Sequence, residues 1–314
     1  KRKYIPWKIT MILSVIFSIF PLILYLKKNN GNYILGLVPI LAFLGFLISN
    51  VKPKIIFSIQ GLPRSNIIFN LNLFLSKFLP NVDYVIPTKS MSEYLDEMYN
   101  QSESIEYEVV PNAVLDSNLI SKSKESVDHQ WYSNDEIFVI TAVGRLTNQK
   151  DFTNLINAFA LTAGSLDFIR LVIIGSGEQK ELLQSLVEDL GLESKVEFLG
   201  FQSNPYKYMN ASDLFVMSSK WEGPGHVLIE ALATGCPVIT TNCPIGPADS
   251  LQNGEFGELV EVGNSKALSE AILYSFKNQS DMLLKVKRSE NYMKKFYTEN
   301  VVNEYKKLLT NKYR

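Results

Sequence analysis

The segment SSKWEGPGHVLIEA, residues 218–231, says more about the fold than any other part of the chain. The glycines and proline that follow Glu222 cannot extend a helix backwards, whereas residues 226–234 have a helical pattern that ends at Gly235. Glu222 is therefore expected in a loop, and Glu230 about five residues, or roughly 7.5 Å, into the helix. The segment predicts a glycine-rich turn that enters a helix between two carboxylates.

The start of this predicted helix has the chemistry of an anion site. The first backbone N–H groups of a helix have no intrahelical acceptor and carry the positive end of the helix dipole, which suits a diphosphate. The glycines allow a phosphate to approach closely. Glu222 and Glu230 could accept hydrogen bonds from sugar hydroxyls at opposite ends of one ligand. By itself this spacing is more typical of two solvated acids. The surrounding sequence therefore decides whether the two acids belong to a ligand site.

Short apolar segments alternate with helical patterns such as 152–161 and 180–190 in the second half of the chain. This alternation predicts βαβ units and a parallel sheet, and ligands of such sheets bind beyond the carboxyl ends of the strands. Arg145 follows the first of these segments and Glu222 the fourth, so both are expected at that edge. The predicted strands are 137–143, 170–174, 195–199, 214–217, 237–240 and 258–260.

Two cations lie in the loop after the first predicted strand. Arg145 offers a planar fork of N–H donors, and Lys150 offers a compact point charge. Both suit a diphosphate, although isolated cations of this kind are more often solvated.

A series of motifs around these residues resembles a known family. Their order and spacing, over about 137–262, are similar to those of the donor-binding domain of the family-4 retaining glycosyltransferases, which have the GT-B fold. The motifs are VGRL at 143–146, QKD at 149–151, LVIIGSG at 171–177, VEFLGF at 196–201, ASDLFV at 211–216, the E-x7-E pair and GCPVI at 235–239.

The resemblance implies an α/β fold with two Rossmann-like parallel-sheet domains facing a cleft. The length of 314 residues allows about two domains. We expect residues 1–116 to form a partial acceptor-side domain, residues 117–295 to form the nucleotide-sugar-binding domain, and residues 296–314 to form a helix that crosses back to the first domain. Relatives open with a strand and a glycine-rich loop that this chain lacks, so the N-terminal domain is expected to be incomplete and the chain to be a fragment.

By the same resemblance, the donor nucleotide sugar contacts eight residues. Arg145 and Lys150 would bind and stabilise the leaving diphosphate, Glu222 would contact the sugar, Glu230 would hold the ribose, and the loop at Phe201 would meet the nucleobase. Arg145, Lys150 and Glu222 are the catalytic candidates. The full donor set is Gly144, Arg145, Lys150, Phe201, Glu222, Gly225, His226 and Glu230.

The glycines at 175 and 177 do not complete a dinucleotide fingerprint, because the third glycine position is Lys180. A tight turn between strand and helix explains them better. His226 at a helix start should resist protonation, and either a donor contact or a packing role fits it. His129 lies in the polar stretch 121–136, and we assign it no role.

The cysteine and histidine content argues against metal and disulfide chemistry. Two cysteines, Cys236 and Cys243, and two histidines form neither a zinc spacing nor a disulfide framework. The resemblance implies no metal and no cofactor, since positive side chains and helix dipoles would offset the charge of the leaving group.

The beginning of the chain has two interpretations. Residues 9–26 and 33–49 are uncharged, which permits a transmembrane hairpin at 9–49, but proline interrupts both spans. We prefer a sheet with strands at 33–37, 54–59 and 82–87 and an interdomain hinge near 109–112. Two departures from the family, Gln60 in place of a histidine and Ala113 in place of a glycine, put the acceptor-side chemistry in doubt.

The net charge of −1 conceals an uneven distribution. Residues 1–82 carry ten Lys and Arg and no acid, and residues 285–314 carry nine basic and three acidic residues. If the C-terminal helix crosses back to the first domain, these segments share one basic face, which suits an anionic membrane surface. We therefore expect a cytoplasmic protein on the cytosolic face of the inner membrane, with no nucleic-acid partner; an ordinary solvated surface is the alternative.

Together these observations favour a retaining hexosyltransferase (EC 2.4.-.-) of bacterial surface-polysaccharide synthesis. It would move a hexose from a UDP- or GDP-sugar to a hydroxyl of a glycan or polyprenyl-linked glycan. Two alternatives stay open: an epimerase-type GT-B enzyme, and a fragment that binds nucleotide sugar without transferring it.

Overall fold

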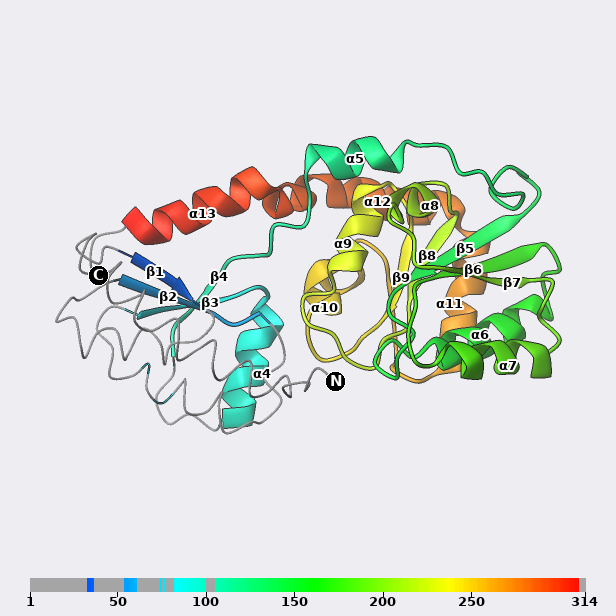
Figure 1. The fold of residues 1–314 in the computed structure, drawn as a ribbon, viewed down its shortest axis with the longest axis horizontal. Coiled ribbons are helices and arrows are strands. Elements are labelled where there is room, and N and C mark those ends of the chain that lie inside the picture. Colours follow the sequence, from blue (N-terminus) through cyan, green and yellow to red (C-terminus); the bar gives the residue numbers. More distant parts are fainter. Residues whose placement is uncertain are drawn as a thin grey trace, which may run out of the picture. The chain divides into compact units, whose positions relative to one another are not determined.

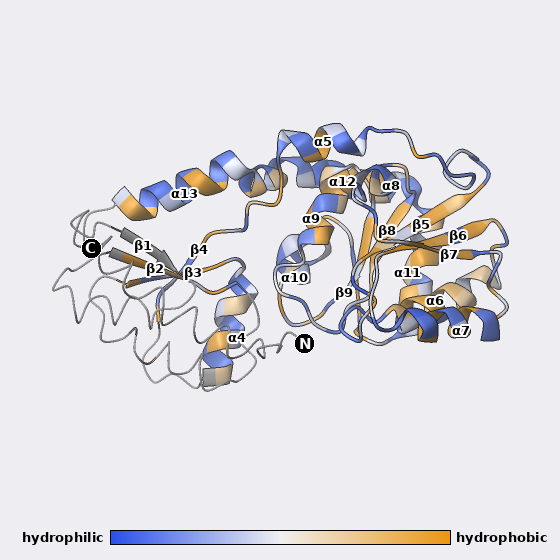
Figure 2. Ribbon diagram, viewed as in Figure 1, coloured by the Kyte–Doolittle hydropathy of each residue, from blue (hydrophilic) through white to orange (hydrophobic). Residues whose placement is uncertain are grey.

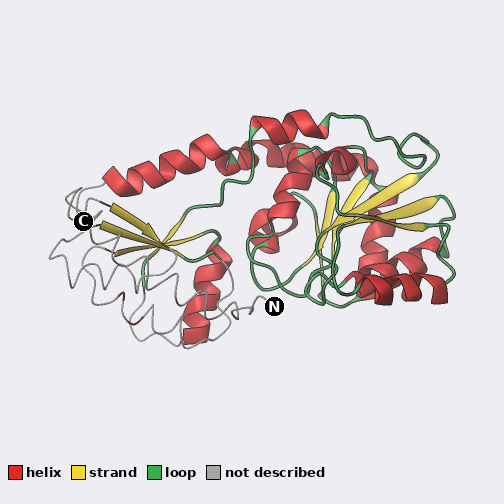
Figure 3. Cartoon of the chain, in the orientation of Figure 1, coloured by secondary structure: helices red, strands yellow, loops and turns green. Residues whose placement is uncertain are grey.

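The computed structural model describes residues 33–36, 54–60, 82–99 and 105–310, together with Phe74 and Ser76. The chain divides into two compact units, each with its own parallel sheet (Figures 1 and 3). The first unit comprises Lys1–Pro87, Asp96–Val110 and Asn303–Arg314, and the second comprises Thr88–Leu95 and Pro111–Val302.

The first unit contains a four-stranded sheet in the order β1-β2-β3-β4. Its strands are β1 (Tyr33–Gly36), β2 (Lys54–Ser58), β3 (Val82–Ile86) and β4 (Tyr107–Val109). The three strands expected from the sequence are confirmed. The branched side chains of Ile55 and Ile56 are buried, which explains why this segment forms an inner strand. Beyond β2, Gln60 donates a hydrogen bond to Ser58 Oγ at 2.5 Å.

The strand β1 also bears on the hairpin alternative. It pairs with β2 in parallel, so residues 33–36 belong to a sheet and not to a second membrane-crossing helix. The rest of 9–49 lies outside the described residues. Within the part of the chain that the structure describes, no helix is long and apolar enough to cross a membrane.

The second unit contains a six-stranded parallel sheet in the order β10-β9-β8-β5-β6-β7. From β5 the chain runs outward through β6 to β7 and then returns to β8, on the other side of β5 (Figure 1). In doubly wound sheets this reversal of strand order is where ligands bind. The strands are β5 (Phe138–Val143), β6 (Ile169–Ile174), β7 (Val196–Gly200), β8 (Leu214–Met217), β9 (Val238–Thr241) and β10 (Glu258–Val260), which confirms the six expected segments.

Helices cover both faces of this sheet. One face buries Ile140 and Ala142 of β5 against Phe159, while the other buries Phe215 of β8 against Leu228. Because both faces are covered, the inner strands are mostly apolar, as the largely orange β5, β6 and β8 of Figure 2 show. The helices of the first face are α6 (Phe152–Ala163), α7 (Lys180–Asp189) and α11 (Ser265–Lys277); those of the second are α5 (Ser117–Ser123), α8 (Tyr206–Asn210), α9 (His226–Ala233) and α12 (Gln279–Met293).

Five further helical elements complete the described part of the chain. They are α4 (Lys89–Tyr99), α10 (Pro247–Ser250), α13 (Thr298–Thr310) and two short 3₁₀ helices, η1 (Gln252–Gly254) and η2 (Lys294–Phe296). The linker after residues 109–112 is fixed to the end of η2, because the backbone N–H groups of Val114 and Leu115 both donate to the carbonyl of Phe296, at 3.0 and 3.1 Å.

Gly175 shows how tightly the loops after β5 and β6 approach each other. Its φ of +147° is rare for residues with a side chain, and a Cβ there would lie 1.8 Å from the carbonyl oxygen of Gly144. The glycines at 175 and 177 are thus explained by close backbone packing as well as by the expected turn. Gly175 holds the loop that carries Arg145 against its neighbour.

Replacing Gly175 by alanine should lower the free energy of unfolding by about 3 kcal/mol or more, because the new methyl group meets backbone and not a flexible side chain. Gly191→Ala is the matched control: φ is +64° but nothing lies within 4 Å, so only the left-handed conformation is penalised, by about 1 kcal/mol. Urea unfolding followed by tryptophan fluorescence measures both. Equal losses would contradict the steric explanation.

Candidate functional site

The loops after β5 and β8 are joined by side-chain amide and backbone contacts. Gln149 accepts a hydrogen bond from Nη2 of Arg145 at 3.3 Å and donates one to the carbonyl of Trp221 at 3.0 Å. The backbone N–H of Lys220 donates to the carbonyl of Gln149 at 2.8 Å. Arg145 itself is exposed, so its guanidinium remains available at the rim of the sheet.

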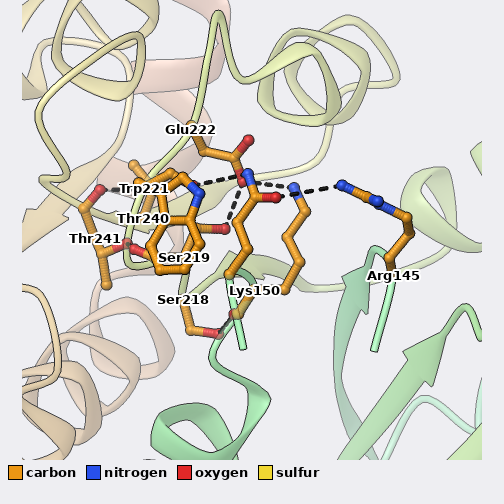
Figure 4. A network of polar contacts seen from close by, with 9 residues as sticks. Arg145, Lys150, Ser218, Ser219, Trp221, Glu222, Thr240 and Thr241 are labelled. Carbon is orange, nitrogen blue, oxygen red and sulfur yellow. Dashed lines mark hydrogen bonds and ion pairs between the residues drawn. The ribbon is translucent and has the colours of Figure 1, made fainter. Parts of the chain in front are cut away.

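An ion pair between Lys150 and Glu222 lies at the centre of this network (Figure 4). Nζ of Lys150 lies 2.5 Å from Oε1 of Glu222, and Ser219 Oγ donates to the same oxygen at 2.6 Å. The two charged side chains are only 15% and 9% exposed. Because Oε2 of Glu222 takes part in neither bond, the carboxylate keeps acceptor capacity for a ligand.

Neighbouring polar groups fix both partners of the ion pair. Ser218 Oγ donates to the carbonyl of Lys150 at 2.8 Å, and Thr241 Oγ1 of β9 donates to the carbonyl of Ser219 at 2.6 Å. Asp151, directly after Lys150, is buried and adopts a left-handed conformation with φ +47°. A non-glycine residue in this conformation is strained, and such strain gathers at functional sites.

The helix α9 begins beside the ion pair, as the sequence predicts. Gly225 precedes it with φ +69° and ψ +45°, a conformation that glycine adopts without a steric cost, and His226 is its first residue. Glu222 lies in the loop and Glu230 on the helix, which confirms their predicted placement.

Glu230 has an unusual proton affinity. Burial raises the pKa of its carboxyl group to about 7, and the positive charge of Lys150 opposes this rise. Lys150 is therefore within electrostatic reach of both acids of the E-x7-E pair.

His226 resists protonation, as expected. Its pKa is lowered mainly by desolvation and further by Lys150, while Glu222 raises it. The residue is exposed as a whole, but the atoms packed around its ring still remove enough water to favour the neutral form. The expected direction is confirmed, but the main cause is desolvation and not the helix dipole.

Phe201 occupies a separate part of the same edge. It follows β7, and its side chain is 78% exposed, so an aromatic face is free for stacking. The structure brings Arg145, Lys150 and Glu222 into one network beside Gly144, Gly225 and His226, whereas no contact joins Phe201 to that network among the described residues.

Several members of the site received no role from the sequence. Ser219, Gln149 and Thr241 hold the ion pair in place. Ser219 and Gln149 lie within the quoted motifs, beside Glu222 and Lys150, whereas Thr241 has no local signal. His129, which received no role, pairs with Glu197 at 3.0 Å and accepts from the backbone of Trp131 at 3.2 Å, so it anchors the segment 121–136.

A hollow of about 650 Å³ adjoins the site at the carboxyl ends of β9 and β10. It is lined by Lys220, Asn242 and Pro244 on one side and by residues 259–262 on the other. Among all the described residues, no group of three or more histidines, cysteines or acids is placed to hold a metal ion. Both cysteines are free and buried.

The fold and the arrangement of the site define a class of protein, the GT-B glycosyltransferases. A crystal structure of the Anabaena protein HepE in complex with UDP and glucose matches with a TM-score of 0.73 at 18% identity, over 93% of this chain and 82% of that one. The family model for glycosyl transferases group 1 matches residues 123–295, more than half of the chain. The chain belongs to the glycosyl transferases group 1 family.

Two curated relatives match this chain over part of their own length. The N-acetylgalactosamine-N,N'-diacetylbacillosaminyl-diphospho-undecaprenol 4-alpha-N-acetylgalactosaminyltransferase of Campylobacter jejuni is 35% identical over 209 residues, 65% of this chain and 54% of the relative. The poly(glycerol-phosphate) alpha-glucosyltransferase of Bacillus subtilis is 26% identical over 295 residues, 88% of this chain and 41% of the relative. The chain thus spans about half the length of these relatives.

The proton on Glu230 should make stability depend on pH. Between about pH 4.5 and 7 the folded protein keeps a proton that the unfolded chain has released, so the free energy of unfolding falls as the pH rises through this window. The loss should approach about 3 kcal/mol.

The Glu230→Gln variant should lack the pH-dependent part of the stability that comes from Glu230. The free energy of unfolding of the variant, relative to that of the wild type, should therefore change between pH 5 and 8. Urea titrations at each pH measure it. Glu188→Gln, which removes an exposed carboxylate from α7, controls for the loss of one acid. A constant difference between Glu230→Gln and wild type would contradict the raised pKa.

Proposed function

We propose that this chain carries the donor site of a retaining glycosyltransferase that moves a hexose from a nucleoside diphosphate sugar to a hydroxyl of a glycan or lipid-linked glycan. The observation that carries the proposal is the placement of Lys150 between two acids at the carboxyl edge of the sheet, beside the start of α9. The names of the relatives, which include a diphospho-undecaprenol-linked acceptor and a poly(glycerol-phosphate), support a role in bacterial surface polysaccharides.

The diphosphate would bind to Lys150, Arg145 and the first N–H groups of α9. A lysine ammonium has three N–H donors, and Glu222 accepts one of them, so Lys150 can bind phosphate oxygens without losing its present partner. Arg145 is exposed, and among the described residues one long bond to Gln149 holds its side chain, which leaves its fork free for a second pair of oxygens.

The rest of the donor would extend to either side of the diphosphate. Glu222 Oε2 would accept a hydrogen bond from a sugar hydroxyl near Gly225, and Glu230 would bind the ribose hydroxyls. Phe201, exposed after β7 at the same edge of the sheet, would meet the nucleobase. The bound UDP in the HepE structure makes UDP-sugars the first donors to test.

Transfer with retention would proceed on one face of the sugar. The bond between the anomeric carbon and the phosphate oxygen breaks, and a bond to the acceptor oxygen forms on the same side. The acceptor proton passes to the leaving phosphate, so no side-chain nucleophile is needed. Lys150, Arg145 and the helix start would stabilise the negative charge that develops on the phosphate.

Thermal shift with UDP-, GDP- and ADP-sugars tests the donor site, because a ligand that binds only the folded state raises the melting temperature. We expect one nucleotide series to stabilise the protein and the shift to disappear in Glu230→Ala. In transfer assays Arg145→Ala and Lys150→Ala should each lower kcat/KM on the order of 10²-fold or more, because each removes charge stabilisation of the leaving group.

His129→Ala is the matched control for these variants. Its ring pairs with Glu197 outside the network, so the change should reduce stability and leave kcat/KM within about twofold. Full transfer activity in both the Arg145 and Lys150 variants would contradict the diphosphate assignment.

We also propose that the enzyme works on the cytosolic face of the inner membrane, held by its basic surface. The excess of lysine and arginine in 285–314 continues along α12 and α13, and each cation near an anionic surface contributes about 1 kcal/mol. Co-sedimentation with phosphatidylglycerol vesicles should show binding that high salt abolishes. Equal sedimentation with neutral phosphatidylcholine vesicles would contradict an electrostatic attachment.

A further inference from the structure

The linker that enters the second unit contacts the first residue of α9. Nδ2 of Asn112 lies 2.8 Å from Nε2 of His226, across 114 positions of the sequence. From the sequence, residues 109–112 are the expected interdomain hinge, and Ala113 is a departure from the family pattern. The contact gives Asn112 a specific partner in the site, the His226 ring.

The chemistry of the two groups sets the position of the ring proton. An amide nitrogen can only donate a hydrogen bond, so Nε2 of His226 must accept, and a neutral imidazole then carries its proton on Nδ1. The lowered pKa of His226 keeps the ring neutral near pH 7; Glu222 and Lys150, the two charged groups that act on it, oppose each other. A neutral ring with Nδ1–H is therefore the form that this contact selects.

The asparagine is held firmly enough to act in this way. Two residues further along, Val114 and Leu115 are bonded through their backbone N–H groups to the carbonyl of Phe296, and Leu115 is fully buried. Asn112 thus extends from an anchored segment. Its partner is equally fixed, because His226 begins α9 directly after the left-handed Gly225.

The other ring nitrogen is free. Among the described residues, Nδ1 of His226 has no polar partner, and the residue is exposed at the same rim as Glu222. An N–H donor with a fixed direction, next to a carboxylate that can only accept, is a pairing suited to a sugar, whose hydroxyls both donate and accept.

We propose that Asn112 is a positioning residue that holds His226 in its Nδ1–H form, so that the ring donates a hydrogen bond to an oxygen of the sugar in the donor. This inference rests on the proposed function for its ligand, but the proton position in the free protein does not. Asn112 would act on the sugar and not on the nucleotide, which separates its effect from that of Lys150 or Glu230.

Nitrogen-15 NMR of the imidazole rings tests the first half without any ligand. The chain has two histidines, so His129→Ala assigns both sets of signals. We expect the wild-type His226 ring to be protonated on Nδ1, the minor form of free histidine in water, and Asn112→Ala to return it to the Nε2–H form. Asn112→Asp should force Nε2–H and raise the pKa of His226, because a carboxylate accepts and is negative.

Binding of UDP-glucose relative to UDP tests the second half. Asn112→Ala should weaken the binding of UDP-glucose by about fivefold, the effect of one neutral hydrogen bond. The affinity for UDP should stay within about twofold of the wild-type value. Asn118→Ala, an exposed amide on α5 with no side-chain hydrogen bond among the described residues, is the matched control and should change neither.

The outcomes separate the two claims. A wild-type ring protonated on Nε2, or a ring unchanged in Asn112→Ala, would overturn the positioning role. A shifted proton with an unchanged ratio of UDP-glucose to UDP affinity would overturn donation to the sugar. If neither ligand binds, the proposed function fails for this donor class, while the NMR result still decides the role of Asn112 in the free protein.

Discussion

The ion pair of Lys150 with Glu222 is the interaction on which the rest of the site depends. Both charges are largely removed from water, and a buried charge is tolerated only when it is paired and hydrogen-bonded. Ser219 supplies the additional bond to the carboxylate. Removing either partner would leave an uncompensated charge beside the start of α9, so the pair fixes the loop geometry as well as the local charge.

Strand order makes this pair possible. Lys150 and Glu222 are 72 positions apart, but they follow β5 and β8, which are neighbours in the sheet. Because the chain reverses its direction of growth between these two strands, their loops leave the sheet edge side by side. The close packing of Gly175 on Gly144 holds the first of these loops from its other side. The order of the strands therefore brings these residues together, and the side-chain contacts then fix their positions.

The difference between strand order and side-chain contacts explains which features were predictable from the sequence. The strands and helices of the second unit were predictable, because buried parallel strands are apolar runs and glycines or prolines mark their ends. Arg145, Lys150, Glu222 and Glu230 were predictable from motif spacing. Their supporting contacts were not predictable, because Gln149 and Thr241 act through loop conformations that no periodicity encodes. The contact of Asn112 with His226 likewise joins two segments that are 114 positions apart, and the linker that carries Asn112 is anchored at Phe296.

The charge state of the site favours an anionic ligand. Lys150 is neutralised by Glu222, whereas Arg145 is exposed, with a neutral amide as its hydrogen-bond partner, and the pKa of Glu230 near 7 leaves that carboxyl partly protonated at neutral pH. These four ionisable groups therefore carry a net positive charge, to which the helix dipole adds. A second full negative charge at Glu230 would repel the diphosphate that we propose as the ligand. Burial of Glu230 thus does more than cost stability, because it keeps an acceptor of hydrogen bonds in the site while withholding part of the charge that would oppose the ligand.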